Sequence, residues 1–186
     1  MIGKNLDHSS VLEQAMEQNV LIDPHMKLLS NFLKYIQYKS SIQSRLYQDL
    51  FASFVVSDQY EKTFFEFGAT DGLNLSNTYT LENLLKWKGA LAEPSPQWHR
   101  KLKENRKGPM IITDCIWSES HKGLEYFVSD YGESSCLNDF KESDKDSMLY
   151  NTTLRTKNGK TVTVKTISLN DVIENFLMIN VLPTFR

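Results

Sequence analysis

The stretch FFEFGATDG (residues 64–72) decides the fold class of this chain. Its first four residues predict a short buried strand, and Gly68 permits a sharp exit in which backbone amides approach a ligand without a Cβ in the way. Asn77 and Thr78 then lead into a helical pattern. A strand, a glycine loop and a helix N-terminus in this order are typical of the βα unit that binds a polar or anionic cofactor. Taken alone, the stretch also fits a strand followed by an ordinary glycine turn.

The segment ALAEPSP (residues 90–96) predicts a second apolar strand that ends at Glu93. A carboxylate at this place suits a ribose, because its two oxygens can accept hydrogen bonds from two adjacent hydroxyls. The alternative is a solvated acid that caps the next helix. This alternative is weaker because Ser95 and Pro96 already provide an N-cap and a first-turn proline for a helix that runs through Leu102.

Four segments, in chain order, resemble the FkbM-type S-adenosylmethionine-dependent methyltransferases. They are FFEFGATDG, SNTYTLE (residues 76–82), LAEPSPQWHRKLKENR (residues 91–106) and VKTISLNDVI (residues 164–173). The likeness covers residues 48–176, most of the chain. It implies an α/β, Rossmann-like class I methyltransferase fold that binds S-adenosylmethionine. It also implies that the methyl group goes to a hydroxyl oxygen of a sugar, a glycan or a small metabolite.

The resemblance further implies which residues bind the cofactor. The loop after the first strand would lie along the methionine part of the cofactor, and Glu93 would hold its ribose. Asp114 and Cys115, which end the apolar run of MIITDCIW (residues 110–117), would flank the adenine. The full set is Glu66, Gly68, Ala69, Thr70, Asp71, Gly72, Asn77, Glu93, Pro94, Asp114 and Cys115. The resemblance names no general base, and His99 and His121 are candidates only by side-chain type.

A dinucleotide-dependent oxidoreductase is the main competing class, since it also has glycines after the first strand and an acid after the second. Its fingerprint, G-x-G-x-x-G, needs a middle glycine to admit a pyrophosphate, whereas this loop has Ala69 and Thr70. Glu66 would repel a pyrophosphate but can lie close to the ammonium of a methionine. Methyl transfer is therefore favoured over hydride transfer.

The composition fits one folded domain. The chain has 186 residues, of which 40% are hydrophobic and 11% aromatic, enough to bury a sizeable core. A net charge of -2 gives no reason to expect nucleic acid as a partner, and the basic residues at 100–107, interrupted by glutamate, predict a solvated helix face. Cys115 and Cys136 lack the spacing of a zinc site, so we expect no metal, and reduced thiols in a cytoplasmic protein. The sequence contains no apolar run of about 18 residues, so we expect no membrane span.

Residues 1–60 predict an N-terminal helical segment ahead of a methyltransferase domain at residues 61–186. One helix should follow Pro24. A second helix should carry an apolar stripe, formed by Leu46, Leu50 and Phe54, and the two helices should cover the sheet or form a lid over the cofactor cleft. The pair Gln48-Asp49 resembles a pair that precedes the glycine loop in the family, and a plain helix surface is favoured over contact with the cofactor.

The chain beyond the third strand predicts further β structure. Residues 124–128 read as a strand, and residues 129–147 as a polar excursion over the surface. The resemblance implies that such a segment can approach the substrate, with Ser134 and Ser135 as candidates, and a solvated loop is favoured over that role. Asn158-Gly159, between two β-rich runs, predicts a hairpin peripheral to the main sheet.

A helix is predicted near the C-terminal end of the sequence. Ser168 and Asp171 offer a capping box for it. Its apolar residues, on one face, are Leu169, Val172, Ile173 and Phe176.

The last residues depart from the family pattern. The family continues with an apolar fourth strand beside the first and an acidic motif, whereas this sequence reads NFLMINVLPTFR (residues 175–186). We therefore expect a C-terminally truncated domain with an incomplete sheet, whose unpaired edge would invite an oligomer or a complementing chain. A frameshift in the gene and a natural short protein are both open explanations. The competing function is a noncatalytic remnant or binding module without methyl transfer.

Overall fold

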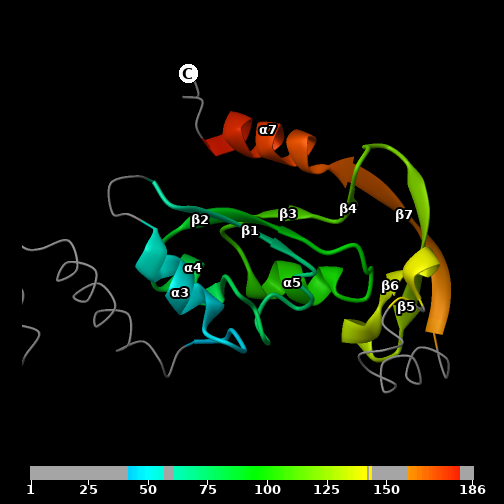
Figure 1. The fold of residues 1–186 in the computed structure, drawn as a ribbon, viewed down its shortest axis with the longest axis horizontal. Helices are drawn as coiled ribbons and strands as arrows, with labels where there is room; N and C mark the ends of the chain where they lie inside the picture. Colours follow the sequence, from blue (N-terminus) through cyan, green and yellow to red (C-terminus); the bar gives the residue numbers. More distant parts are fainter. Residues whose placement is uncertain (1–41, 57–60, 142, 144–158, 181–186) are drawn as a thin grey trace, which may run out of the picture.

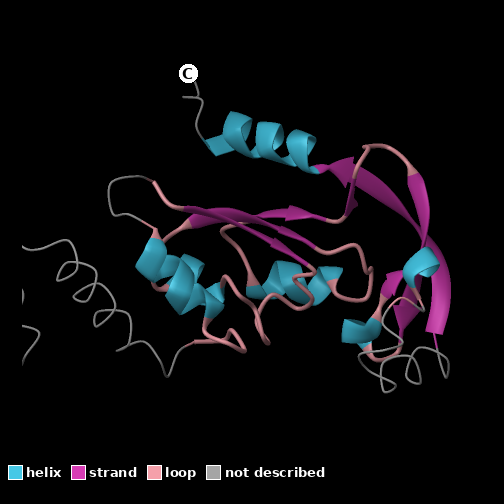
Figure 2. Cartoon of the chain, viewed as in Figure 1, coloured by secondary structure: helices cyan, strands magenta, loops and turns pink. Residues whose placement is uncertain are grey.

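Two small sheets, with helices on both faces of the first, form a mixed α/β fold (Figures 1 and 2). The structure, a computed structural model, describes residues 42–56, 61–141, 143 and 159–180. The helix predicted after Pro24, and most of the predicted N-terminal segment, lie outside the described residues. Among the described helices, none is long and apolar enough to span a bilayer.

The first sheet consists of three parallel strands in the order β1-β2-β3. They are β1 (Thr63–Phe67), β2 (Lys88–Ala92) and β3 (Met110–Ile112). The register aligns Glu66 with Leu91, and Leu91 with Ile111. Because parallel strands share a carboxyl edge, the glycine loop after β1 and the acid after β2 arrive at the same end of the sheet. This arrangement confirms the three strands predicted from the sequence.

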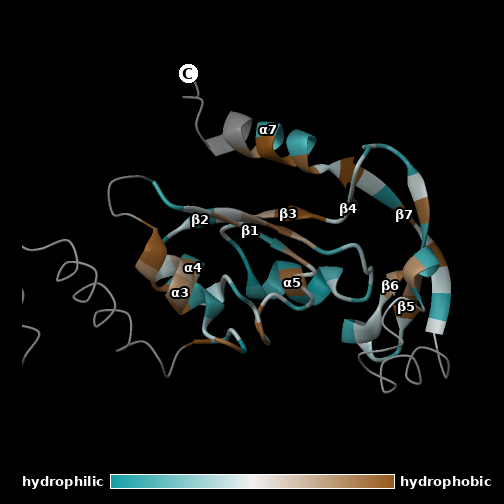
Figure 3. Cartoon of the chain, in the orientation of Figure 1, coloured by the Kyte–Doolittle hydropathy of each residue, from teal (hydrophilic) through white to brown (hydrophobic). Residues whose placement is uncertain are grey.

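Apolar side chains cover both faces of this sheet. On one face lie α4 (Tyr79–Asn83) and α5 (His99–Asn105), and on the other lies α7 (Leu169–Asn180), as Figures 1 and 3 show. Leu91 and Leu102 are fully buried on the α5 side, while Val172 packs with Ala90 on the α7 side. Each large aliphatic side chain buried in this way contributes about 1.5–3 kcal/mol. The α7 helix is therefore held mainly by its apolar face.

The second sheet has the order β4-β7-β5-β6. Its strands are β4 (Cys115–Trp117), β5 (Gly123–Ser129), β6 (Cys136–Leu137) and β7 (Gly159–Ser168). β7 runs parallel to β4 and antiparallel to β5, so it is an inner strand. The predicted strands at 124–128 and in the run after Gly159 are confirmed. The first arm of the predicted hairpin lies outside the described residues, and the second arm, β7, lies outside the three-stranded sheet, as predicted.

The run MIITDCIW does not form one strand. β3 ends at Ile112, whose carbonyl accepts the Glu93 amide at 3.0 Å, and β4 begins at Cys115 in the other sheet. Asp114 lies at the bend between them. The polar excursion after β5 also contains more structure than predicted, with the one-turn helices η2 (Gly132–Ser134) and η3 (Asn138–Phe140) on either side of β6.

The helix predicted around Leu50 exists as α3 (Gln48–Val55), but its apolar stripe does not form a core face. Leu46 precedes the helix and is 75% exposed, and Phe54 is only half-buried. The buried residues are Asp49 and Ser53, because their side chains find local hydrogen-bond partners. The surface role favoured for Asp49 was therefore wrong.

Two predicted helix starts have different outcomes. At α7, Ser168 Oγ accepts a hydrogen bond from the Asp171 amide at 3.1 Å, which confirms the predicted cap. The second bond of a capping box is not formed, because the Asp171 carboxylate accepts from the Ser120 hydroxyl and the Ser168 amide donates to Ser120 Oγ. At α5 the predicted cap was wrong. The helix begins at His99 with Trp98 before it, because the chain first makes a turn in which the Trp98 amide donates to the Ser95 carbonyl at 3.1 Å.

Candidate functional site

The loop after β1 is held in left-handed backbone conformations. Gly68 has φ +65° and Gly72 has φ +73°, and Thr70 also has a positive φ of 47° despite its branched side chain. A Cβ on Gly72 would lie 2.6 Å from Leu102 Cδ1, so only glycine fits there, whereas a Cβ on Gly68 would meet open space. The loop thus packs tightly at one end and is open at the other.

Glu66, at the end of β1, is a buried carboxylate surrounded by donors. Ser76 Oγ and Thr78 Oγ1 donate to its Oε2, at 2.9 and 2.5 Å, and the Asn77 amide donates to its Oε1 at 2.8 Å. These donors come from the segment that leads into α4. The carboxylate therefore joins the first strand to the start of the helix, and Oε1 keeps an acceptor position.

Arg106, directly after α5, is the largest fully buried side chain of the site and was missed in the sequence. Its Nε donates to Glu82, and its Nη1 donates to the Gly72 carbonyl at 3.0 Å and to Ser76 Oγ at 3.1 Å. The Glu66 carboxylate lies 4.0 Å from Nη1. The predicted solvated basic face is thus wrong at this position. Arg106 follows Leu102 by four residues, a spacing that indicated the buried side of the helix.

Glu93, at the end of β2, also acts on the glycine loop. Its Oε2 accepts the Thr70 amide and its Oε1 accepts the Ser95 amide, both at 2.8 Å. The side chain is only 3% exposed. Burial raises the pKa of this carboxyl above its ordinary value, and the two amides and the nearby His99 oppose that shift. The Glu93 side chain therefore joins the end of β2 to the glycine loop that follows β1.

A polar cavity of about 240 Å³ lies beside the loop. Its lining residues come from the end of β1, the loop, the segment before α4 and η2, and they are Glu66, Phe67, Gly68, Ala69, Thr70, Asn74, Leu75, Ser76, Asn77 and Glu133. The lining includes two glutamates but neither lysine nor arginine. The exposed Glu133 was not singled out in the sequence, because nothing local relates η2 to the glycine loop.

The remaining predicted cofactor residues do not line this cavity. Asp71 accepts the amides of Leu73 and Asn74, at 2.9 and 2.8 Å, and so shapes the turn. Pro94 and Asp114 are half-buried beyond β2 and β3. Cys115 is buried with a free thiol, and burial followed by the charge of Glu93 raises its pKa. Six of the eleven predicted residues, counting Gly72 and Glu93, are thus outside the cavity wall.

The two histidines and two serines named as further candidates are also placed away from the cavity wall. His99 Nε2 contacts the Glu93 carbonyl at 2.8 Å, and His121 lies in the turn between β4 and β5. Ser135 Oγ accepts the Ser129 amide at 3.0 Å, and Ser134 is buried. Across the described ranges, no three His, Cys, Asp or Glu side chains group as metal ligands.

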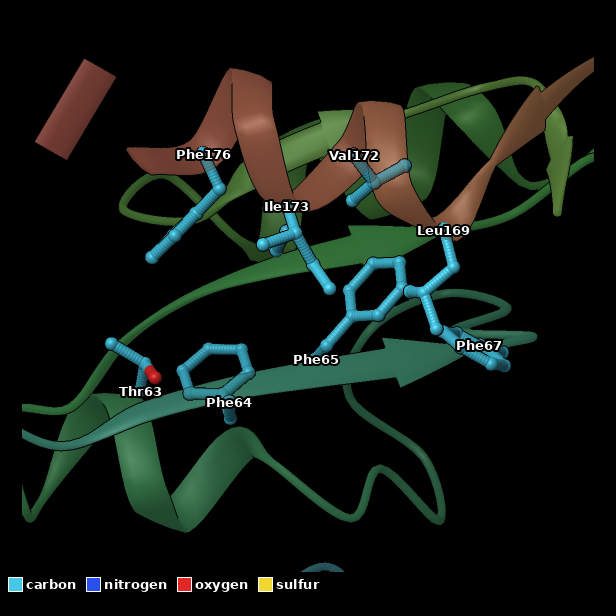
Figure 4. A pocket seen from close by; sticks show the side chains of 9 residues that line it. Thr63, Phe64, Phe65, Phe67, Leu169, Val172, Ile173 and Phe176 are labelled. Atoms are coloured by element: carbon cyan, nitrogen blue, oxygen red, sulfur yellow. The ribbon is translucent and has the colours of Figure 1, made fainter. Parts of the chain in front are cut away.

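A second, apolar cavity of about 460 Å³ lies between β1 and α7 (Figure 4). Val172 and Ile173 point from the helix toward Phe65, which projects from the strand. Thr63 is the one polar residue among those that line it. This groove lies on the α7 face of the sheet, whereas Glu66 points to the α5 face.

No family model, curated protein or solved structure matches this chain. The geometry and charge of the site are therefore the basis for assigning a function.

Proposed function

We propose that this chain is a Rossmann-like S-adenosylmethionine-dependent methyltransferase domain that acts on a hydroxyl of a sugar, a glycan or a small metabolite. The main support is the bond from the Thr70 amide to Glu93, which joins the loop after β1 to the acid after β2. Beside this bond lies a polar cavity with Glu66 in its wall. Parallel strands that present a loop and a carboxylate together are suited to a nucleoside-containing cofactor.

The charge of the site favours a cationic ligand. Glu66 and Glu82 are two carboxylates around one guanidinium, that of Arg106, so the cluster carries excess negative charge. The cavity wall adds Glu133 and no basic residue. An ammonium or sulfonium is attracted by this field, and a phosphate is repelled. A methionine end therefore suits the cavity better than a pyrophosphate does.

The size of the cavity supports a position in it for only part of the cofactor. Pockets for whole ligands usually measure about 300–1,000 Å³, and this one measures about 240 Å³. We place the methionine end in it and the adenosine beyond Thr70, toward Glu93 and Asp114. Each Glu93 oxygen accepts one backbone amide and keeps one acceptor position for a ribose hydroxyl. Since Glu93 is almost fully buried, the residues that cover it must move to admit the ribose.

The transfer step needs alignment and a proton acceptor. The acceptor oxygen attacks the methyl carbon in line with the sulfur, the carbon–sulfur bond breaks with its electrons left on sulfur, and the hydroxyl proton goes to a base. In the cavity wall, Glu66 is held by Arg106 and by hydroxyl donors, which favours Glu133 as the base. The protein otherwise positions the two reactants.

Calorimetric titration with S-adenosylmethionine tests this proposal. We expect saturable binding that weakens about tenfold or more in Glu66→Gln and in Glu93→Ala, each of which removes a carboxylate from the proposed ligand contacts. Glu104→Gln, an exposed acid on α5, is the matched control and should bind normally. A chain that is folded by circular dichroism but gives no heat with the cofactor would contradict the proposal.

A binding module without methyl transfer is the second candidate. The observation in its favour is that neither histidine lines the cavity, so its wall offers only the carboxylates of Glu66 and Glu133 as proton acceptors. Incubation with methyl-labelled cofactor and a panel of sugars distinguishes the two functions. Transfer of the label supports the enzyme, whereas binding without transfer across the panel supports the module.

A further inference from the structure

The first strand is an edge of its sheet, and its outward main-chain groups can be assigned. The Lys88 amide donates to the Lys62 carbonyl at 3.1 Å, so the main chain of residue 62 faces β2. Since main-chain groups alternate along a strand, those of Phe64 and Glu66 face β2 as well. The amides and carbonyls of Thr63, Phe65 and Phe67 therefore point outward, and within the described ranges no strand pairs with them.

This edge lacks the features that normally prevent strand pairing. Within β1 there is no proline or lysine, and its one charged residue, Glu66, points to the α5 face, where it accepts hydrogen bonds from Ser76 and Thr78. On the α7 face, Phe65 and Phe67 stand beside the apolar groove of Figure 4. Phe67 is 56% exposed, and Ile173 across the groove is 47% exposed.

We propose that a second copy of this chain docks on the edge, with the two β1 strands antiparallel about a two-fold axis through Phe65. In this register Phe65 lies opposite Phe65 of the second copy, and Thr63 lies opposite Phe67. All three residues direct both main-chain groups outward, so each facing pair exchanges both of its hydrogen bonds. The edge is thus complementary to itself, as an isologous contact requires.

The chemistry of the groove fits the same occupant. The residues that line it carry no charge, so two copies meet there without like-charge repulsion. Facing aromatic side chains at the axis add a favourable cross-strand contact. The lining has nine residues, against roughly 20–30 a side in a standard interface. We therefore expect a weak dimer with a dissociation constant on the order of 10–100 µM.

Sedimentation velocity from about 1 to 300 µM tests the dimer. The unmodified chain should shift from monomer to dimer over this range. Phe67→Lys, which introduces two charges into the interface, should raise the dissociation constant about tenfold or more. Adding Thr63→Glu to Phe67→Lys should restore association, because positions 63 and 67 face each other across the axis. Phe51→Lys, at an exposed phenylalanine of α3, is the control and should associate normally.

Amide hydrogen exchange on the unmodified chain tests the register without relying on a variant that must fold. The amides of Phe65 and Phe67 should exchange more slowly as concentration rises, while those of Phe64 and Glu66 should be protected at all concentrations. A chain that stays monomeric throughout the range would overturn the proposal. So would dimerisation that leaves the Phe65 and Phe67 amides unprotected, or association only with an unrelated protein. The pairing does not depend on methyl transfer, because it uses the outward main-chain groups of β1 and the apolar groove, which shares only Phe67 with the wall of the polar cavity.

Discussion

The Arg106 guanidinium lies 4.0 Å from the Glu66 carboxylate, and both side chains are buried. This pair joins the end of α5 to the end of β1, and the Gly72 carbonyl and Ser76 hydroxyl complete the set of partners. Asn105, the preceding residue, donates to the Asp71 carbonyl at 2.8 Å. The glycine loop is therefore positioned by the C-terminal end of a helix as well as by its own sequence.

Arg106→Met should lower the free energy of unfolding by about 3–5 kcal/mol, because it leaves the buried Glu66 and the half-buried Glu82 without their cation. Urea unfolding measures this change. Arg100→Met, on the exposed side of the same helix, is the matched control and should change stability by less than about 0.5 kcal/mol. Equal losses in the two variants would contradict the structural role of Arg106.

Gly72→Ala should destabilise the chain by about 2–4 kcal/mol, since its Cβ would meet Leu102 and Arg106 and its φ is positive. Gly68→Ala has open space around it and should cost only about 1 kcal/mol for the left-handed backbone. Thermal unfolding of the two variants compares them directly. A larger loss at Gly68 than at Gly72 would show that the loop packs differently.

The affinity for S-adenosylmethionine should fall with decreasing pH through the raised pKa of Glu93, whose ordinary value is 4.5. Ribose hydroxyls donate to the ionised carboxylate, and burial makes this group take up a proton at a higher pH than an exposed glutamate does. Titrations at several pH values measure the profile. Glu93→Gln should bind more weakly with a flatter profile over the same range, and an unchanged profile would place the ribose elsewhere.

Asp171 should make the stability of the chain fall at acid pH. Hydrogen bonds from Ser120 and Ser168 lower the pKa of its carboxyl in the folded chain. Its stabilising contribution is therefore present above the ordinary value of 3.8 and is lost as the pH falls through the lowered one. Asp171→Asn should reduce stability at neutral pH and remove this dependence. Unfolding midpoints measured across the acid range check the result, and parallel curves for the two chains would refute it.

Glu133→Gln should reduce the turnover number of methyl transfer while leaving cofactor affinity within about threefold, if Glu133 takes the acceptor proton. Glu125→Gln, an exposed acid on β5, is a matched control that should leave both quantities unchanged. Kinetics with a labelled methyl donor separate turnover from affinity. A loss of affinity alone would make Glu133 a cofactor ligand instead of a base.

The sequence predicted those elements whose determinants are local. The apolar run before Gly68, the strand before Glu93 and the cap at Ser168 each depend on a few neighbouring residues, and the structure contains all three. The cap expected at Ser95 failed because the chain makes a turn from the Ser95 carbonyl to the Trp98 amide before the helix begins. The apolar stripe of α3 failed because Asp49 and Ser53 are the buried residues of the helix, where Asp49 accepts from the Ser44 hydroxyl and the Ser53 hydroxyl donates to the Leu50 carbonyl.

By itself, the sequence determined the three parallel strands and the loop that needs glycine at its tight turn. The apolar runs that form strands, and the freedom of glycine to adopt a positive φ, depend on only a few neighbouring residues. Only the tertiary structure decided that Arg106 is buried against Glu66, that Glu133 approaches the glycine loop, and that an apolar groove lies between β1 and α7. These three features bring together residues distant in the chain. Their contacts depend on how the helices pack on the sheet, which no local pattern encodes.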